Sequence, residues 1–278
     1  MARDARPGLT SHSIPPVTVP PVRLEREIAL VTGSTAGIGK AIATAFAVEG
    51  ARVVVTGRDA RRGKAVVDTI TRDGGHAAFH AAELSDEAAC SQLVSAVVDQ
   101  FDGLTVLVNN AAGSTVDEAD VPVAQMTTAT WEATLRVNLT APMWLARAAI
   151  PHMVEAGHGS IVNISTRAAE RASRGLAAYI ASKGGLNALT RSIAIDYAES
   201  NIRCNTISPG YVLNERRDAE LDDTRRARLE GMHLTRLGEA TDVAHAAVYL
   251  ASSESDFVTG VNLPLDGGGS GARGLTLG

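Results

Sequence analysis

Short apolar runs alternate with longer amphipathic stretches along most of the chain, beginning at Ile28. The runs predict strands at residues 28–32, 52–57, 76–81, 104–110, 160–165, 202–207 and 261–266. Continuous apolar strands that alternate with helices are typical of a parallel sheet covered on both faces. The pattern therefore predicts an α/β fold, with a single doubly wound parallel sheet and helices on both of its faces.

The stretches between these strands have helical periodicity, at residues 37–50, about 86–101, about 130–155 and 177–199. Asp86 has the side chain and the position of an N-cap for the second of these helices. Pro142 falls inside the third, and we expect it to bend or loosen that helix. No second domain is indicated.

Composition changes at the two ends and in one long connection. Residues 1–25 are rich in proline and predict a flexible tail, and residues 26–268 form the predicted domain. Residues 269–278 are expected to be a C-terminal tail. Residues 211–240 are rich in Arg, Asp and Glu and lack strand character. A long connection after a parallel strand is where a substrate lid would lie.

The overall composition excludes some classes of protein. The chain has 278 residues, 45% hydrophobic and 21% charged, with a formal net charge of -5. This acidic balance argues against a nucleic-acid partner, and no apolar run reaches the roughly 18 residues that span a bilayer. Cys90 and Cys204 are far apart and lack metal-ligand spacing. We therefore expect a cytoplasmic protein with no metal site.

Three glycines follow the first strand. Gly33, Gly37 and Gly39 have the spacing G-x-x-x-G-x-G at a predicted strand-to-helix turn. Such a turn lets backbone amides approach a pyrophosphate, which the N-terminus of the helix attracts. An ordinary tight turn is the alternative. The position between a clear strand and an amphipathic helix favours a nucleotide site.

The end of the second strand bears on which dinucleotide is preferred. An NAD site commonly has an acid there, to bind the ribose hydroxyls. This chain has Gly57 followed by Arg58, and an arginine can pair with a 2′-phosphate. A solvated arginine beside Asp59 is the alternative. We predict that NADP(H) is preferred, with NAD(H) possible.

Tyr179 and Lys183 are four residues apart in a predicted helix, so they lie on the same face. Reduction of a ketone puts negative charge on oxygen, which a positioned proton donor must neutralise. A free tyrosine has a pKa of about 10, and a nearby cation lowers it. The pair therefore suits acid/base chemistry on a carbonyl or alcohol.

Six motifs in order carry a resemblance to a known family. They are "TGSTAGIG" (32–39), "NNAAG" (109–113), Asn138 in "VNLT", "YIASK" (179–183), "SPG" (208–210) and "DGG" (266–268). The sequence resembles the short-chain dehydrogenases/reductases over residues 26–268. The resemblance implies a Rossmann-type domain that interconverts a ketone and a secondary alcohol of a small molecule by hydride transfer with NAD(P)(H).

The resemblance also implies roles for residues. Tyr179 would be the acid/base, Lys183 would bind the nicotinamide ribose and lower the tyrosine pKa, and Asn138 would hold a proton-relay water. The implied cofactor-binding residues are Gly33, Thr35, Gly37, Ile38, Gly39, Arg58, Glu83, Leu84, Asn110, Ala111, Tyr179, Lys183, Pro209, Gly210 and Val212. A homo-oligomer is also implied, a tetramer or else a dimer, through the helices at 130–155 and 177–199.

The family's catalytic serine lies thirteen residues before the tyrosine. Counting back from Tyr179 gives Thr166, with Ser165 one residue earlier as the fallback. Neighbours in a strand point to opposite faces, so both hydroxyls cannot face the substrate. We expect Thr166 to be the catalytic hydroxyl. The sequence also departs from the family pattern at Glu83 and Asn214, where cofactor contacts are plausible but altered.

Two other functions stay open at this stage. One is a 3-oxoacyl-thioester reductase, and the other is a family member that binds cofactor without catalysis. The acidic 211–240 region offers no obvious basic dock for a carrier protein, so small ketones rank higher. His152, His158 and His233 lack ligand spacing, and we expect them to be ordinary surface or core side chains.

Overall fold

One parallel sheet of seven strands forms the centre of the computed structural model, which describes residues 22–113, 121–214 and 218–271. Its strands are β1 (Ile28–Val31), β2 (Arg52–Gly57), β3 (His76–Ala81), β4 (Val106–Asn109), β5 (Gly159–Ile164), β6 (Ile202–Pro209) and β7 (Asn262–Leu265). Their order across the sheet is β3-β2-β1-β4-β5-β6-β7, and every pairing is parallel. The predicted doubly wound sheet is confirmed, and all seven predicted strands are present.

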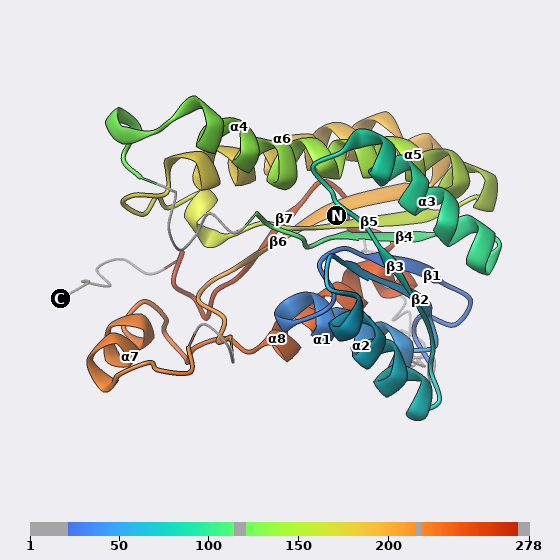
Figure 1. Ribbon diagram of the computed structural model, residues 1–278, viewed down its shortest axis with the longest axis horizontal. Helices are drawn as coiled ribbons and strands as arrows, with labels where there is room; N and C mark the ends of the chain where they lie inside the picture. Colours follow the sequence, from blue (N-terminus) through green and yellow to red (C-terminus); the bar gives the residue numbers. More distant parts are fainter. Residues whose placement is uncertain (1–21, 114–120, 215–217, 272–278) are drawn as a thin grey trace, which may run out of the picture.

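Helices cover both faces of this sheet (Figure 1). On one face lie α1 (Gly37–Val48), α2 (Ala60–Arg72) and α8 (Ala240–Ala251), and on the other lie α3 (Glu87–Phe101), α5 (Ala141–Ala156) and α6 (Ala177–Asp196). Alternate residues of β1 supply the two cores: Ala29 and Val31 join one buried cluster, and Ile28 and Leu30 join the other. This alternation is the two-residue period of a strand that is buried on both sides.

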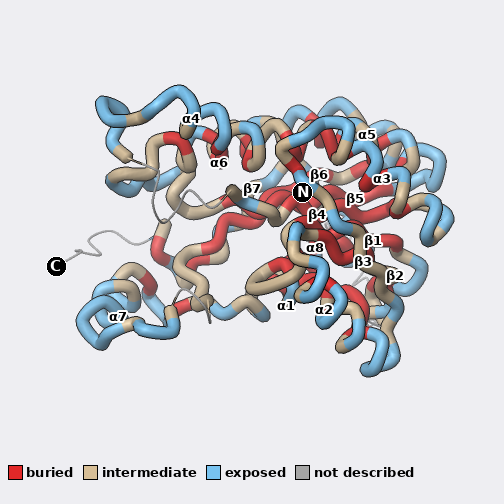
Figure 2. Tube along the Cα trace, viewed as in Figure 1, coloured by how far each residue is buried: buried red, intermediate tan, exposed pale blue. Residues whose placement is uncertain are grey.

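Two further helices and five short turns complete the elements of the described residues. They are α4 (Thr128–Leu135), α7 (Asp223–Glu230), the π turn η2 (Arg136–Thr140), and the 3-10 turns η1 (Val123–Gln125), η3 (Arg167–Ala169), η4 (Ala198–Ser200) and η5 (Ser253–Ser255). Helix α7 belongs to the 211–240 connection and lies apart from both layers, at the lower left of the view. None of its residues is buried (Figure 2).

The helical region expected over residues 130–155 is present as three consecutive pieces, with the expected local irregularity beside Pro142. The π turn η2 separates α4 from α5. Pro142 lies in the first turn of α5, directly after the π turn. Because proline has no backbone N–H, it removes one donor from the ladder that follows this turn. Asp86 caps α3 as expected, and its carboxylate accepts a hydrogen bond from the Ala89 amide.

The ends of the domain lie further out than expected. Leu24 is fully buried, and Arg23 forms an ion pair with Glu49, so residues 22–25 belong to the domain and not to a tail. At the other end, the carbonyls of Gly269 and Ser270 accept hydrogen bonds from Arg171. The remaining parts of the two expected tails, residues 1–21 and 272–278, lie outside the described residues.

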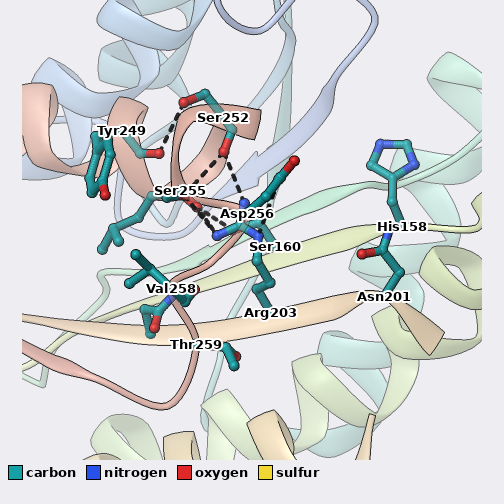
Figure 3. A network of polar contacts seen from close by, with 12 residues as sticks. His158, Ser160, Asn201, Arg203, Tyr249, Ser252, Ser255, Asp256, Val258 and Thr259 are labelled. Carbon is teal, nitrogen blue, oxygen red and sulfur yellow. Dashed lines mark hydrogen bonds and ion pairs between the residues drawn. The ribbon is translucent and has the colours of Figure 1, made fainter. Parts of the chain in front are cut away.

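A network around Arg203 fixes β6 to the connection between α8 and β7 (Figure 3). The guanidinium donates hydrogen bonds to the carbonyls of Leu250 and Ser252 and to the Ser255 hydroxyl, over 2.8–3.0 Å. Asp256 lies 3.8 Å from the guanidinium. The side chain of Arg203 is only 11% exposed, and burial lowers its pKa. Arg203 therefore connects the start of β6 to the end of α8, to the residue after it and to η5.

Across the described part of the chain, no helix combines the length and the apolar character needed to span a membrane.

Candidate active site

The turn between β1 and α1 has the backbone geometry of a phosphate cradle. Gly33 and Gly37 have φ angles of +62° and +53°, a region that favours glycine. The N-cap residue of α1, Ala36, provides no side-chain hydrogen bond to the first turn of the helix. Backbone N–H groups at such a helix start attract an anion.

A second motif holds this turn from the neighbouring strand. The Asn110 side-chain amide donates to the carbonyls of Thr32 and Gly33, at 2.9 and 3.2 Å. The Thr32 hydroxyl accepts from the backbone amides of Asn110 and Ala111. A Cβ atom on Gly39 would lie 2.4 Å from the Asn110 amide nitrogen, so only glycine fits there. Thr32 is a supporting residue that sequence reasoning did not assign to the site, although it ends the first predicted strand and begins the glycine motif.

A cavity of about 730 Å³ lies beside these motifs at the sheet edge. It is placed where the chain leaves β1 and β4 toward opposite faces, the point at which doubly wound sheets bind ligands. Seven of the predicted cofactor residues line it: Gly33, Thr35, Arg58, Glu83, Leu84, Asn110 and Ala111. The volume is typical of a site for a ligand of cofactor or drug size.

Two arginines line the end of this cavity beyond β2. Arg58 is 77% exposed and lies 3.9 Å from the Glu83 carboxylate. Arg62, one helical turn further, also lines the cavity and pairs with Asp59 at 2.7 Å. Sequence reasoning missed Arg62, although its spacing of four from Arg58 indicates the same side of the chain. A Cβ atom on Gly57 would lie 2.7 Å from the Thr35 side chain, so an acid is poorly accommodated there.

Asn138 connects the cavity to the helix that carries Tyr179. Its side-chain oxygen accepts from the Gly113 backbone amide at 2.9 Å, and its amide donates to the Ser182 hydroxyl at 3.2 Å. Ser182 in turn donates to the Tyr179 carbonyl at 2.7 Å. Asn138 is fully buried in the π turn. Its side chain therefore positions other groups, and Ser182 is a second supporting residue that the motifs did not single out.

Tyr179 and Lys183 lie on adjacent turns of α6. The Lys183 ammonium is 6.0 Å from the centre of the Tyr179 ring. Lys183 is only 2% exposed, and burial lowers its pKa from 10.5 to about 8. A pKa near 8 keeps the side chain largely protonated at pH 7. The structure thus brings a buried cation close to a half-buried phenol.

The two candidate hydroxyls after β5 have different surroundings. Ser165 is 5% exposed, and its hydroxyl lies 3.4 Å from the Lys183 carbonyl. Thr166 is partly exposed, has extended backbone, and accepts a hydrogen bond from the Ala168 amide at 3.2 Å. Ser165 is therefore directed toward α6, whereas Thr166 retains access to solvent.

The remaining predicted cofactor residues are not among those that line the cavity. Ile38 is partly buried and packs on the core. Pro209 ends β6 and Gly210 follows it, while Val212 forms a bridge with Gly238. A Cβ atom on Gly37 would lie 3.3 Å from the Asn214 amide nitrogen, which places the start of the 211–240 connection beside the glycine turn.

The residues present fit a nicotinamide dinucleotide. The cradle at Gly33 and Gly39 has no room for side chains, and the cavity continues from it toward two arginines. The helix start supplies amides for a pyrophosphate. Tyr179 and Lys183 follow at the carboxyl edge of the sheet, on the side of β5.

Comparison with known proteins gives the same picture. A family model described as enoyl-(acyl carrier protein) reductase matches residues 33–270. The 7alpha-hydroxysteroid dehydrogenase of Clostridium sardiniense is 38% identical over 247 residues, which cover 88% of this chain and 94% of that protein. The 3-oxoacyl-(acyl-carrier-protein) reductase of Chlamydia pneumoniae is 34% identical over 239 residues, covering 86% of this chain and 95% of that protein.

Solved structures share the fold over nearly the whole chain. A candidate NAD(P)-dependent gluconate 5-dehydrogenase from Beutenbergia cavernae, solved with NADP bound at low occupancy, is 33% identical and has a TM-score of 0.83. The match covers 90% of this chain and 99% of that chain. These matches, with the fold and the cleft, show that the chain belongs to the short-chain dehydrogenase/reductase family.

Proposed function

We propose that this enzyme transfers hydride between NADP(H) and a small molecule that carries a ketone or a secondary alcohol, with Tyr179 as the acid/base. The observation that carries the proposal is the juxtaposition of the Tyr179 phenol and the Lys183 ammonium on a helix that Asn138 connects, through Ser182, to the cavity-lining residue Gly113. Membership of a family of dehydrogenases and reductases supports it.

The residues divide the chemistry between them. When bound, the nicotinamide supplies or accepts the hydride. Tyr179 donates its phenolic proton to the carbonyl oxygen, and the Thr166 hydroxyl donates a second hydrogen bond to the same oxygen. The positive charge of Lys183 favours the phenolate that forms. Asn138 and Ser182 hold the turn of α6 that carries Tyr179.

The cofactor preference follows from charge at the far end of the cleft. Arg58 and Arg62 can form charge-assisted hydrogen bonds with a 2′-phosphate. Glu83 can compete for Arg58, since its carboxylate lies 3.9 Å away. NADP(H) is therefore the preferred cofactor in this proposal, and NAD(H) can bind more weakly.

Oxidation of NADPH with a panel of small ketones tests the function directly. Wild-type protein is expected to turn over at least one of them, and Tyr179→Phe is expected to abolish turnover while NADPH affinity stays within a few-fold. Retained activity in Tyr179→Phe would remove Tyr179 from the acid role. NADPH binding without turnover of any carbonyl would favour a cofactor sensor.

A 3-oxoacyl-thioester reductase is the second candidate, because one relative of similar length is named for that activity. Adding a short 3-oxoacyl thioester to the panel distinguishes the two substrate classes. A specificity constant for the thioester far above that for every free ketone would favour the second candidate.

Assembly and location complete the proposal. Val154 on α5 and Ile195 on α6 are 47% and 78% exposed, which supports self-association through this helical layer. We propose a homo-oligomer, most simply a tetramer, in the cytoplasm, where the buried free thiols Cys90 and Cys204 would stay reduced. Sedimentation analysis tests the first statement, and cell fractionation tests the second.

A further inference from the structure

His233 lies in the 211–240 connection but is almost fully buried, with 6% exposure. Its Nδ1 is 2.9 Å from the Leu229 carbonyl oxygen, and its Nε2 is 3.0 Å from the Tyr211 backbone nitrogen. A carbonyl can only accept and a backbone amide can only donate. Nδ1 therefore carries the proton, and the lone pair of Nε2 accepts from Tyr211.

This imidazole rests on the end of β6. A Cβ atom on Gly210 would lie 2.6 Å from His233 Nε2 and 3.0 Å from Cβ of Asp266. Gly210 is thus enclosed between the histidine ring and the turn that follows β7. The backbone from Pro209 to Tyr211 is held from one side by β7, through the Gly210 amide and the Leu265 carbonyl, and from the other by His233.

The residues on either side of His233 have anchors of their own. The Met232 carbonyl accepts from the Arg167 guanidinium at 2.8 Å, and Arg167 directly follows Thr166. The Leu234 amide donates to the Gly267 carbonyl at 2.8 Å. If the imidazole is lost, these two hydrogen bonds still hold Met232 and Leu234 in place. A variant at His233 is therefore expected to keep its fold.

We propose that His233 is a positioning residue. By accepting a hydrogen bond from the Tyr211 amide, its Nε2 fixes the Pro209–Tyr211 backbone, which would bind the nicotinamide end of the cofactor. The inference rests on the proposed function, because the family resemblance assigns Pro209 and Gly210 to binding of the cofactor that the proposed reaction uses. It goes further, because it assigns the backbone geometry of Pro209–Tyr211 to His233, a side chain of the 211–240 connection. Both hydrogen bonds of the ring go to the main chain, at Leu229 and Tyr211, so His233 is assigned a positioning role.

Two substitutions distinguish the effect of losing the Nε2 acceptor from the effect of losing the volume of the ring. In His233→Gln the side-chain oxygen can reach the place of Nε2, whereas in His233→Asn the shorter amide reaches only the place of Nδ1. His233→Asn is expected to raise the NADPH dissociation constant and KM about tenfold, the effect of one lost hydrogen bond, with kcat within a few-fold of wild type. His233→Gln is expected to restore NADPH affinity. His76→Gln, at an exposed histidine at the start of β3, is the matched control.

Trypsin provides a second readout, because α7 carries the exposed sites Arg225, Arg226 and Arg228. His233→Asn is expected to be cleaved there faster than wild type and His233→Gln, with little change in Tm. Equal NADPH affinity for wild type, His233→Asn and His233→Gln would overturn the inference. Equally weak binding by both variants would also overturn it, because the acceptor would then not matter.

The proposed function fails separately from this inference. If wild-type protein binds NADPH but reduces no carbonyl, the function is wrong, and the comparison of NADPH affinities still decides the role of His233. If wild-type protein binds neither NADPH nor NADH, both are overturned.

Discussion

The Lys183 ammonium donates a hydrogen bond of 2.7 Å to the main-chain carbonyl of Ile164, at the end of β5. This bond ties the helix that carries Tyr179 to the strand that leads into Ser165 and Thr166. The ammonium is buried, and desolvation lowers its pKa. A charge held in this way is retained at a cost to stability, as is common at catalytic sites.

The first prediction concerns stability and pH. Lys183 has a pKa of about 8 in the folded protein and 10.5 as its ordinary value. Below pH 8 both states carry the proton, and burial of the charge costs the folded state roughly 3 kcal/mol. Between pH 8 and 10.5 only the unfolded chain binds the proton, so the contribution of Lys183 to stability rises with pH.

Lys183→Met removes this dependence and the ammonium together. The free energy of unfolding is measured in urea, without cofactor, for the variant and for wild type. The value for the variant minus that for wild type is expected to fall by roughly 2–3 kcal/mol from pH 7 to pH 10. Lys64→Met, at an exposed lysine on α2, should show no such trend. A constant difference for Lys183→Met would mean that the buried lysine titrates normally. Carbonyl reduction should be lost in Lys183→Met.

The second prediction separates the two hydroxyls after β5. Thr166→Val is expected to lower kcat on the order of 10²-fold, because one hydrogen bond to the developing oxyanion is lost. Thr166→Ser retains the hydroxyl and should stay within a few-fold of wild type. Ser165→Ala should cost far less than Thr166→Val. The opposite ranking, measured by steady-state kinetics, would assign the role to Ser165.

The third prediction concerns cofactor choice. Arg58→Ala is expected to weaken NADPH binding by roughly 10- to 100-fold, the effect of one charged hydrogen bond, while NADH binding changes little. Arg61→Ala is the control, since Arg61 is an exposed arginine in the first turn of α2, three residues after Arg58, and lies outside the cavity lining. Calorimetric titration with both cofactors measures the ratio. An equal loss for NADPH and NADH would place Arg58 away from the 2′-phosphate.

The fourth prediction concerns the Arg203 network. Arg203→Met removes three hydrogen bonds from a largely buried site and is expected to destabilise the fold by about 2–3 kcal/mol in urea. NADPH affinity should be unchanged, because Arg203 lies near the start of β6 and the cofactor cleft lies at the carboxyl ends of the strands. Arg191→Met, on the exposed surface of α6, is the control. A change in NADPH affinity without loss of stability would contradict this assignment.

The hydrophobic pattern by itself determined the sheet and its two helical layers. Strands β2 and β3 have the predicted bounds, and β2 ends at Gly57, a residue type that strands disfavour. The glycine spacing and the Tyr179–Lys183 pair were also readable, because backbone clearance and helical spacing are local properties of the chain. Pro142 indicated an irregular helix, but the π turn ahead of it depends on how residues 136–140 pack around buried Asn138.

Tertiary structure decided which side chains meet at the site, because that depends on contacts between segments far apart in the sequence. Arg62 and Ser182 take part in the site only because strands and helices far apart in sequence meet at the cleft. His233 looked like an ordinary histidine, since its partners Tyr211 and Gly210 lie more than twenty residues earlier. The lowered pKa of Lys183 likewise follows from burial by the assembled fold. Local periodicity specifies the elements, whereas contacts and desolvation across the sheet specify the chemistry of the side chains.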